Sequence, residues 1–145
     1  MSEVLPSTMA FEAADVLKTH HLGGRQPTIG LVLGSGLGAY AETEGYPVSV
    51  PYGKIPFFPK VKVAGHAGVL WCGTIGDKTV VALQGRVHPY EGYPMKTLVH
   101  PVRTMIHLGC ETIILTNAAG SINPNFVPGN LVLMSDHINL LGDNP

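Results

Sequence analysis

An uninterrupted apolar run, Ile29–Leu33, followed at once by the glycine-rich segment Gly34–Gly38, constrains the fold of this chain most strongly. A short apolar run without alternation is typical of a strand that is buried on both faces. Apolar residues between Met95 and Ile106 recur at a helical spacing, and the apolar run Thr112–Leu115 follows that segment. A helix that leads into a buried strand indicates an α/β fold.

The other expected elements indicate a mixed sheet and not a regular series of strand–helix–strand units. A first helix is expected from the capping residues Ser7 and Thr8 to about His20. Because Pro101 lies inside the later helical pattern, that helix is expected to kink or to begin near Pro101. The further strand-like runs are Pro47–Val50, Val61–Ala64, Val69–Cys72, Thr79–Leu83 and Leu131–Met134. We therefore expect an α/β fold with a mixed, partly parallel central sheet flanked by helices.

Composition and net charge exclude several classes of protein and of binding partner. Of the 145 residues, 45% are apolar and only 13% are charged, which favours one domain with a buried core over disorder. The net charge is −1 and no basic run occurs, so neither nucleic-acid nor membrane-surface binding is expected. No apolar stretch approaches the ~18 residues of a membrane span and no secretory signal is visible, so a cytoplasmic protein is expected. Cys72 and Cys110 lie among apolar residues and are expected to be buried free thiols.

The glycine-rich segment has three interpretations, of which an ordinary glycine turn is the simplest. Glycines directly after a strand also expose backbone N–H groups that can hold an anion, and Ser35 adds a hydroxyl donor. Gly34–Ala39 fits, in addition, the GxGxxA pattern of dinucleotide-binding folds. The helix that would follow, Ala39–Glu44, is too short for a crossover, and residues 52–56 lack the acid that should hold the ribose. The segment therefore favours a small anion pocket over a dinucleotide site.

A second candidate site lies where the strand Thr79–Leu83 ends. If the extended backbone continues, Arg86 and His88 point to the same side, because side chains alternate along a strand. A guanidinium and an imidazole that converge there can bind a tetrahedral dianion. Glu91 is expected either to orient one of them or to face solvent. The alternative for the whole segment is a solvated surface loop.

Small polar residues also follow the strand Thr112–Leu115. The Asn117 side chain and the backbone N–H of Ala118 are available there as donors, although a compact turn chosen for packing explains the same residues equally well. His66 stands between small residues at a strand junction, as either a turn residue or a pocket residue. The seven histidines include no group with the spacing of metal ligands, so no metal site is expected.

Five segments together resemble the trimeric purine nucleoside phosphorylases, in the branch that cleaves inosine and guanosine. They follow the family's order and spacing, as GSGLG at Gly34–Gly38, VAGHAG at Val63–Gly68, QGRVHPYEGY at Gln84–Tyr93, TNAAG at Thr116–Gly120 and DHINL at Asp136–Leu140. The resemblance implies a phosphorylase/hydrolase-like fold and the phosphorolysis of purine nucleosides to free base and ribose 1-phosphate. Inorganic phosphate is then a co-substrate, and no cofactor is implied.

The resemblance also implies a role for each candidate residue. The phosphate site would consist of Ser35, His66, Arg86, His88 and the backbone N–H of Ala118. Tyr90 would lie over the ribose, and the catalytic residues would be His88, Glu91 and Asn117. Enzymes of this family continue for about as much sequence again. Residues 1–145 are therefore expected to be a truncated, N-terminal part of a single phosphorylase domain, homotrimeric at full length.

Two alternatives stay open at this point. The first is a non-catalytic phosphate- or nucleoside-binding fragment, because the residues that recognise the purine would lie beyond residue 145. The second is a dinucleotide-binding oxidoreductase domain, which only the GxGxxA pattern supports. A hydrolase that uses water is weaker than either, since Arg86 together with His88 favours the binding of an anion.

Overall fold

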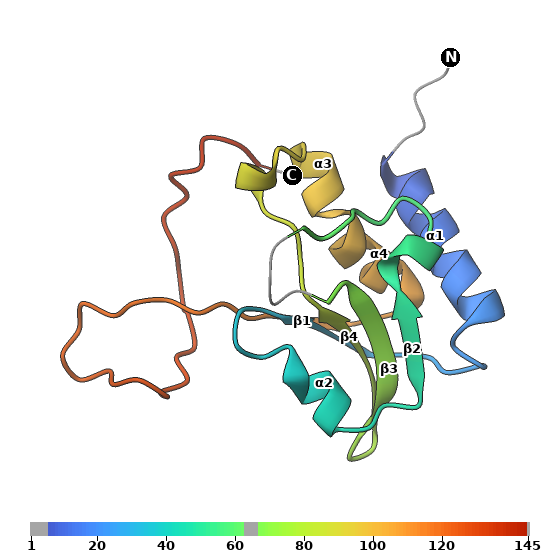
Figure 1. The fold of residues 1–145 in the computed structure, drawn as a ribbon, viewed down its shortest axis with the longest axis horizontal. Coiled ribbons are helices and arrows are strands. Elements are labelled where there is room, and N and C mark those ends of the chain that lie inside the picture. Colours follow the sequence, from blue (N-terminus) through green and yellow to red (C-terminus); the bar gives the residue numbers. More distant parts are fainter. Residues whose placement is uncertain (1–5, 63–66, 145) are drawn as a thin grey trace.

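A five-stranded mixed sheet forms the centre of the computed structural model, which describes residues 6–62 and 67–144 (Figure 1). The strands lie in the order β2-β3-β4-β1-β5. Their bounds are β1 Ile29–Leu33, β2 Val48–Pro51, β3 Val69–Ile75, β4 Lys78–Gln84 and β5 Thr112–Leu115. Strand β1 pairs in parallel with both β4 and β5, whereas β3 is antiparallel to β2 and to β4. The expectation of a mixed, partly parallel sheet is confirmed.

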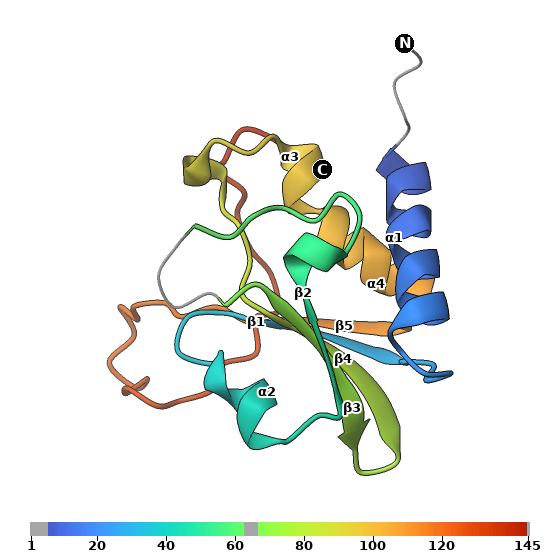
Figure 2. The same ribbon diagram turned by 45° about the vertical axis from the view of Figure 1, so that its right-hand side comes forward.

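Helices cover both faces of the sheet, but to very different extents (Figure 2). The helices are α1 Pro6–His20, α2 Ala39–Thr43, α3 Met95–Leu98 and α4 His100–Leu108, and two 3-10 turns span Tyr52–Lys54 and Pro89–Glu91. The main core packs α1 and α4 against one face, through side chains such as Leu17, Met105 and Leu83. The other face carries only a small cluster around Ala41 of α2. The short helix α2 is thus held by few apolar contacts.

The helical pattern around Pro101 is divided between two elements. Helix α3 is a single turn, and α4 begins at His100 with Pro101 in its first turn. Proline is tolerated there because the first N–H groups of a helix have no partner within it. The expectation of a helix beginning near Pro101 is confirmed. At the N-terminus, α1 begins at Pro6, so Ser7 and Thr8 lie inside its first turn, and the expectation that they precede the helix as caps is wrong.

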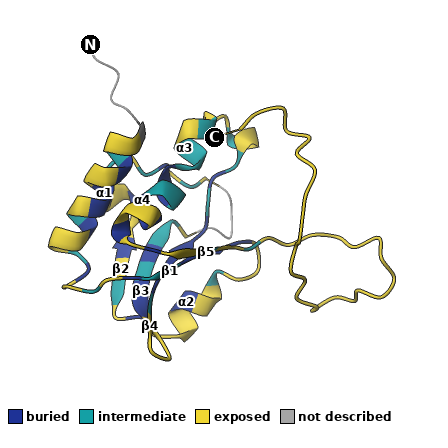
Figure 3. Cartoon of the chain, turned by 180° about the vertical axis from the view of Figure 1, so that it is seen from behind, coloured by how far each residue is buried: buried dark blue, intermediate teal, exposed yellow. Residues whose placement is uncertain are grey.

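The segment after β5 forms neither helix nor strand in the described residues, and it is exposed throughout residues 117–144 (Figure 3). The strand expected at Leu131–Met134 is therefore wrong. Leu131 and Leu133 are each 97% exposed, and no neighbouring strand is available to pair with this segment within the described chain. The strand expected at Val61–Ala64 is also absent at Val61 and Lys62, and its remainder lies outside the described residues.

Two further expectations concern single side chains and helix length. Cys72 and Cys110 are buried and unpaired, as predicted. Burial raises the pKa of the Cys110 thiol to about 11, and the neighbouring Cys72 adds to that shift. Among the described helices none has both the length and the apolarity needed to cross a bilayer.

Candidate anion-binding site

The candidate site forms where the parallel strands β1, β4 and β5 end at the same edge of the sheet. Three loops leave this edge, at Gly34–Gly38, Gly85–Tyr93 and Thr116–Gly120. In open α/β sheets, ligands bind beyond the carboxyl ends of the strands. The topology thus brings together three segments that are distant in the sequence.

Gly34 and Thr116 join the first and third loops. The backbone N–H of Gly34 donates to Thr116 Oγ1 over 2.8 Å, and that hydroxyl donates to the Val32 carbonyl over 2.8 Å. A Cβ atom on Gly34 would lie 2.5 Å from the Thr116 carbonyl oxygen, which is closer than real Cβ contacts. Only glycine allows the β1 and β5 ends to approach this closely.

Arg86 crosses from the end of β4 to the end of β5. Its Nη1 donates to the Thr116 carbonyl, and its Nε lies 3.5 Å from His88 Nε2. The two side chains therefore lie on the same side, as the alternation along an extended strand predicted. Both are half-buried. A guanidinium presents five donors in a planar fork, a geometry that suits the binding of phosphate and carboxylate groups.

Glu91 fixes the orientation of the His88 ring. Its Oε1 accepts a hydrogen bond from the His88 backbone N–H over 2.7 Å and lies 3.3 Å from His88 Nδ1. The Glu91 side chain is only 5% exposed, so the alternative of a solvent-facing acid is excluded. Burial alone would raise the pKa of Glu91, but the hydrogen bonds from the backbone and the ring of His88 outweigh it and hold the pKa below its usual value. A carboxylate therefore holds Nδ1 and leaves Nε2 directed towards Arg86.

Tyr90 covers the outer side of this group. Its ring is stacked on the His88 ring, with centroids 4.9 Å apart and an angle of 12° between the planes. Tyr90 is 75% exposed, so a large part of its ring remains available to a ligand. The structure thus brings Arg86, Tyr90 and Glu91 each into contact with His88.

The other predicted residues lie at the same edge without joining that group. Ser35 is exposed in the glycine-rich loop, and Asn117 and Ala118 are exposed directly after β5. The Asn117 amide makes a long contact of 3.4 Å to the Ala118 carbonyl. His66 lies outside the described residues. Within the described ranges, no three His, Cys, Asp or Glu side chains lie close enough to hold a metal ion.

Sequence reasoning missed the residues that join the loops. Thr116 belongs to the motif Thr116–Gly120, but the motif does not predict that its hydroxyl and carbonyl connect Gly34 and Arg86. Gln84 was also missed, although a polar residue that ends an apolar strand was a usable signal. Its side chain is buried and bonds to Trp71 and Glu42.

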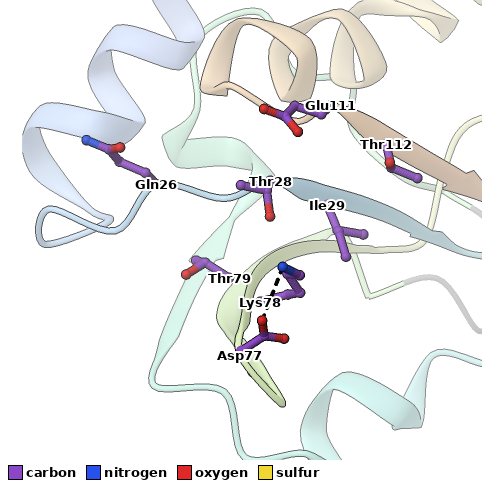
Figure 4. Close-up of a pocket in the computed structure, with 8 residues that line it drawn as sticks. All are labelled: Gln26, Thr28, Ile29, Asp77, Lys78, Thr79, Glu111 and Thr112. Carbon is purple, nitrogen blue, oxygen red and sulfur yellow. Dashed lines mark ion pairs between the residues drawn. The ribbon is translucent and has the colours of Figure 1, made fainter.

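A cavity of about 330 Å³ lies at the opposite, amino ends of the same strands (Figure 4). Its lining includes Thr28 before β1, Thr79 of β4 and Thr112 of β5. The charged pair Lys78–Asp77 on its rim spans 3.2 Å and is largely exposed. An exposed pair of this kind is weak, so it gives the cavity no strong site for an anion.

Comparisons with known proteins agree with the geometry of the carboxyl edge. A profile of the phosphorylase superfamily matches residues 28–145. Purine nucleoside phosphorylase 1 of Geobacillus stearothermophilus is 51% identical over 119 residues, which are 82% of this chain and 43% of that protein. The purine nucleoside phosphorylase of Bos taurus is 44% identical over 124 residues, which are 83% of this chain and 43% of that protein. The resemblance inferred from the five motifs is confirmed.

Solved structures agree as well. Isoform 2 of the purine nucleoside phosphorylase from Schistosoma mansoni, in complex with cytosine and ribose-1-phosphate, superposes with a TM-score of 0.72 at 41% identity. The match covers 84% of this chain and 42% of that one. The chain thus spans less than half the length of these relatives.

Proposed function

This chain belongs to the phosphorylase superfamily, and on that premise we propose that it supplies the phosphate site and part of the ribose site of a purine nucleoside phosphorylase. The observation that carries the proposal is the contact of Arg86 with His88 at the meeting point of β4 and β5. The names of the relatives and the ribose-1-phosphate bound in a solved neighbour support the choice of reaction.

The proposed chemistry follows from where charge develops. When the glycosidic bond breaks, the sugar takes on positive charge, and a phosphate dianion held beside it stabilises that charge. Arg86 and His88 would bind the dianion, and the Ser35 hydroxyl and the Ala118 backbone N–H would add donors from the neighbouring loops. Holding phosphate and sugar in line also removes much of the entropic cost of their encounter.

Three further residues would act around the bound phosphate, namely Glu91, Tyr90 and Asn117. Glu91 lies against His88 Nδ1 and would keep the imidazole in one orientation beside Arg86. The exposed ring of Tyr90 would cover the ribose, and the Asn117 amide would donate near the phosphate and the sugar. Among these groups none requires a metal or an organic cofactor. A cytoplasmic homotrimer would be the assembly of the full-length protein.

A non-catalytic phosphate- or nucleoside-binding role is the second candidate, because the chain spans only 43% of the curated relatives described above. The dinucleotide alternative is disfavoured, since α2 has only five residues and cannot serve as the crossover helix. A titration with NAD, followed by the fluorescence of Trp71, is expected to show no saturable binding.

The test combines binding with turnover. Isothermal titration with inorganic phosphate is expected to show binding that Arg86→Ala weakens by roughly 10- to 100-fold, because each charge-assisted hydrogen bond contributes about 1.5–3 kcal/mol. Arg103→Ala, which removes the same charge from α4, is the matched control and is expected to bind like the wild type. Equal affinities of the two variants would refute the phosphate site.

Release of hypoxanthine from inosine then distinguishes the two candidate functions. Release that requires phosphate, in a sample whose intact mass matches this chain, would establish the phosphorylase. Phosphate binding without any release would establish the binding fragment instead.

A further inference from the structure

Helix α2 holds the end of the glycine-rich loop, yet it cannot be stable by itself. It has five residues, Ala39–Thr43, and Gly38, the N-cap residue before it, offers no side-chain cap. Isolated helices of this length do not form in water. One backbone hydrogen bond connects it to the loop, from Tyr40 N–H to the Leu37 carbonyl, and a second lies within the loop, from Leu37 N–H to the Gly34 carbonyl. Thr116 fixes the start of the loop at Gly34, so the position of Ser35 depends in addition on what holds α2 against the sheet.

A chain of side-chain hydrogen bonds holds α2 against the sheet. Trp71 Nε1 donates to Gln84 Oε1 over 2.7 Å, and Gln84 Nε2 donates to Glu42 Oε1 over 2.7 Å. An indole nitrogen only donates and a carboxylate only accepts, so the Gln84 amide has one allowed orientation. Gln84 is 5% exposed, and both ends of its amide are satisfied. The three residues come from β3, β4 and α2.

Apolar packing provides only a limited alternative connection. Ala41 is the buried residue of α2, and it packs in a cluster with Leu33, Tyr46 and Ala82. A single methyl group buries little area compared with the leucine and methionine side chains that fix α4. The bond between Glu42 and Gln84 is thus the main directional contact between α2 and the sheet.

Gln84 also stands at the strand end that leads to Arg86. It is the last residue of β4, and Arg86 follows two positions later. We propose that Glu42 and Gln84 are positioning residues, whose hydrogen bond fixes the glycine-rich loop relative to Arg86 so that Ser35 and Arg86 bind the same phosphate. This inference rests on the proposed function. It assigns Glu42 no contact with substrate, because its Oε1 is occupied by the Gln84 amide.

The experiment compares three variants of one helix. Glu42→Ala removes the acceptor, whereas Glu42→Gln keeps an oxygen that can accept from Gln84 Nε2. Glu44→Ala is the matched control, because it removes the same charge two positions later, where the helix ends. Both variants remove one negative charge from the same helix, and only Glu42→Ala also removes the bond to Gln84.

Two measurements are made on each variant. Hydrogen exchange followed by mass spectrometry, without phosphate, is expected to be faster in residues 34–43 of Glu42→Ala and unchanged in β4. Calorimetric titration with inorganic phosphate is expected to show about tenfold weaker binding in the same variant, which corresponds to the loss of one hydrogen bond. Glu42→Gln and Glu44→Ala are expected to match the wild type in both measurements.

The outcomes separate the inference from the proposed function. Unchanged exchange in Glu42→Ala would overturn the inference, and so would faster exchange with undiminished phosphate affinity. If the wild-type chain binds no phosphate, the proposed function fails, and the role of Glu42 and Gln84 in phosphate binding fails with it. Faster exchange together with weaker phosphate binding, restored in Glu42→Gln, would support the inference.

Discussion

The substitution Gly34→Ala tests the close approach of the β1 and β5 ends. The added Cβ would lie 2.5 Å from the Thr116 carbonyl oxygen, 3.1 Å from its carbonyl carbon and 3.2 Å from Asn117 Cα. All three are backbone atoms, so no side chain can rotate to make room. Ordinary contact begins near 3.4 Å, so the two strand ends must separate by about 0.9 Å.

The size of the effect follows from that displacement. Forced overpacking of a well-packed site costs about 1–3 kcal/mol of the free energy of unfolding. For a chain of about 150 residues, this corresponds to a fall in Tm of roughly 3–10 °C. Separation of the loops by nearly 1 Å also displaces Ser35 from Arg86, so phosphate binding that uses both residues is expected to weaken.

Urea unfolding and phosphate titration measure the two effects. Gly120→Ala is the matched control, since its Cβ would meet no atom within 4 Å and it lies in the same third loop. The expected result is a lower urea midpoint and weaker phosphate binding for Gly34→Ala alone. If Gly34→Ala and Gly120→Ala unfold at the same midpoint, the close approach of the strand ends is refuted.

Three further predictions concern other parts of the chain. Burial lowers the pKa of His100, although its hydrogen bond to Pro56 opposes the shift. The contribution of His100 to stability is therefore full above about pH 6.5 and is lost as the pH falls towards the lower folded-state value. Urea unfolding at pH 7.5 and 5.5 should show a smaller loss of stability for His100→Asn than for the wild type, and an equal loss would contradict this. Burial raises the pKa of Tyr46 from 10 to about 12. The unfolded chain therefore loses the phenol proton first, and stability falls as the pH rises between these values. Thermal unfolding followed by circular dichroism should show a smaller fall in stability for Tyr46→Phe than for the wild type. Strand β5 lies at the edge of the sheet and exposes Ile114 and Leu115 by 46% and 60%. Concentrated samples should therefore self-associate. Sedimentation velocity should show less association for Ile114→Lys than for the wild type.

Local patterns were sufficient to predict most elements of the fold. The apolar run Ile29–Leu33 and the helical spacing around Met105 each correspond to an observed element. The apolar residues Leu131–Met134 look equally strand-like, yet no strand forms there. A strand needs a neighbour with free backbone groups, and that depends on tertiary structure which the segment itself does not encode. The same limit applies to the central place of β1 between β4 and β5.

The arrangement of the candidate site could also be predicted only in part. Alternation along an extended backbone predicted that Arg86 and His88 lie on the same side. The interpretation of Glu91 stayed open, because burial decides it and the three-residue spacing to His88 does not. The bond between Glu42 and Gln84 was not predicted, since 42 positions separate them and only Gln84 belongs to a motif.

The arrangement of β1 has a consequence for the order of folding. Strands β3 and β4 are joined by a tight turn and pair between Ile75 and Lys78, so this hairpin needs only a short loop to close. In contrast, Ile29 pairs with Val80 and with Thr112, far along the chain. Closing such long loops costs entropy before any contact repays it, which makes non-local pairing slow. The three strand ends at the candidate anion site therefore come together only after β5 has been synthesised, and later than the β3–β4 hairpin closes.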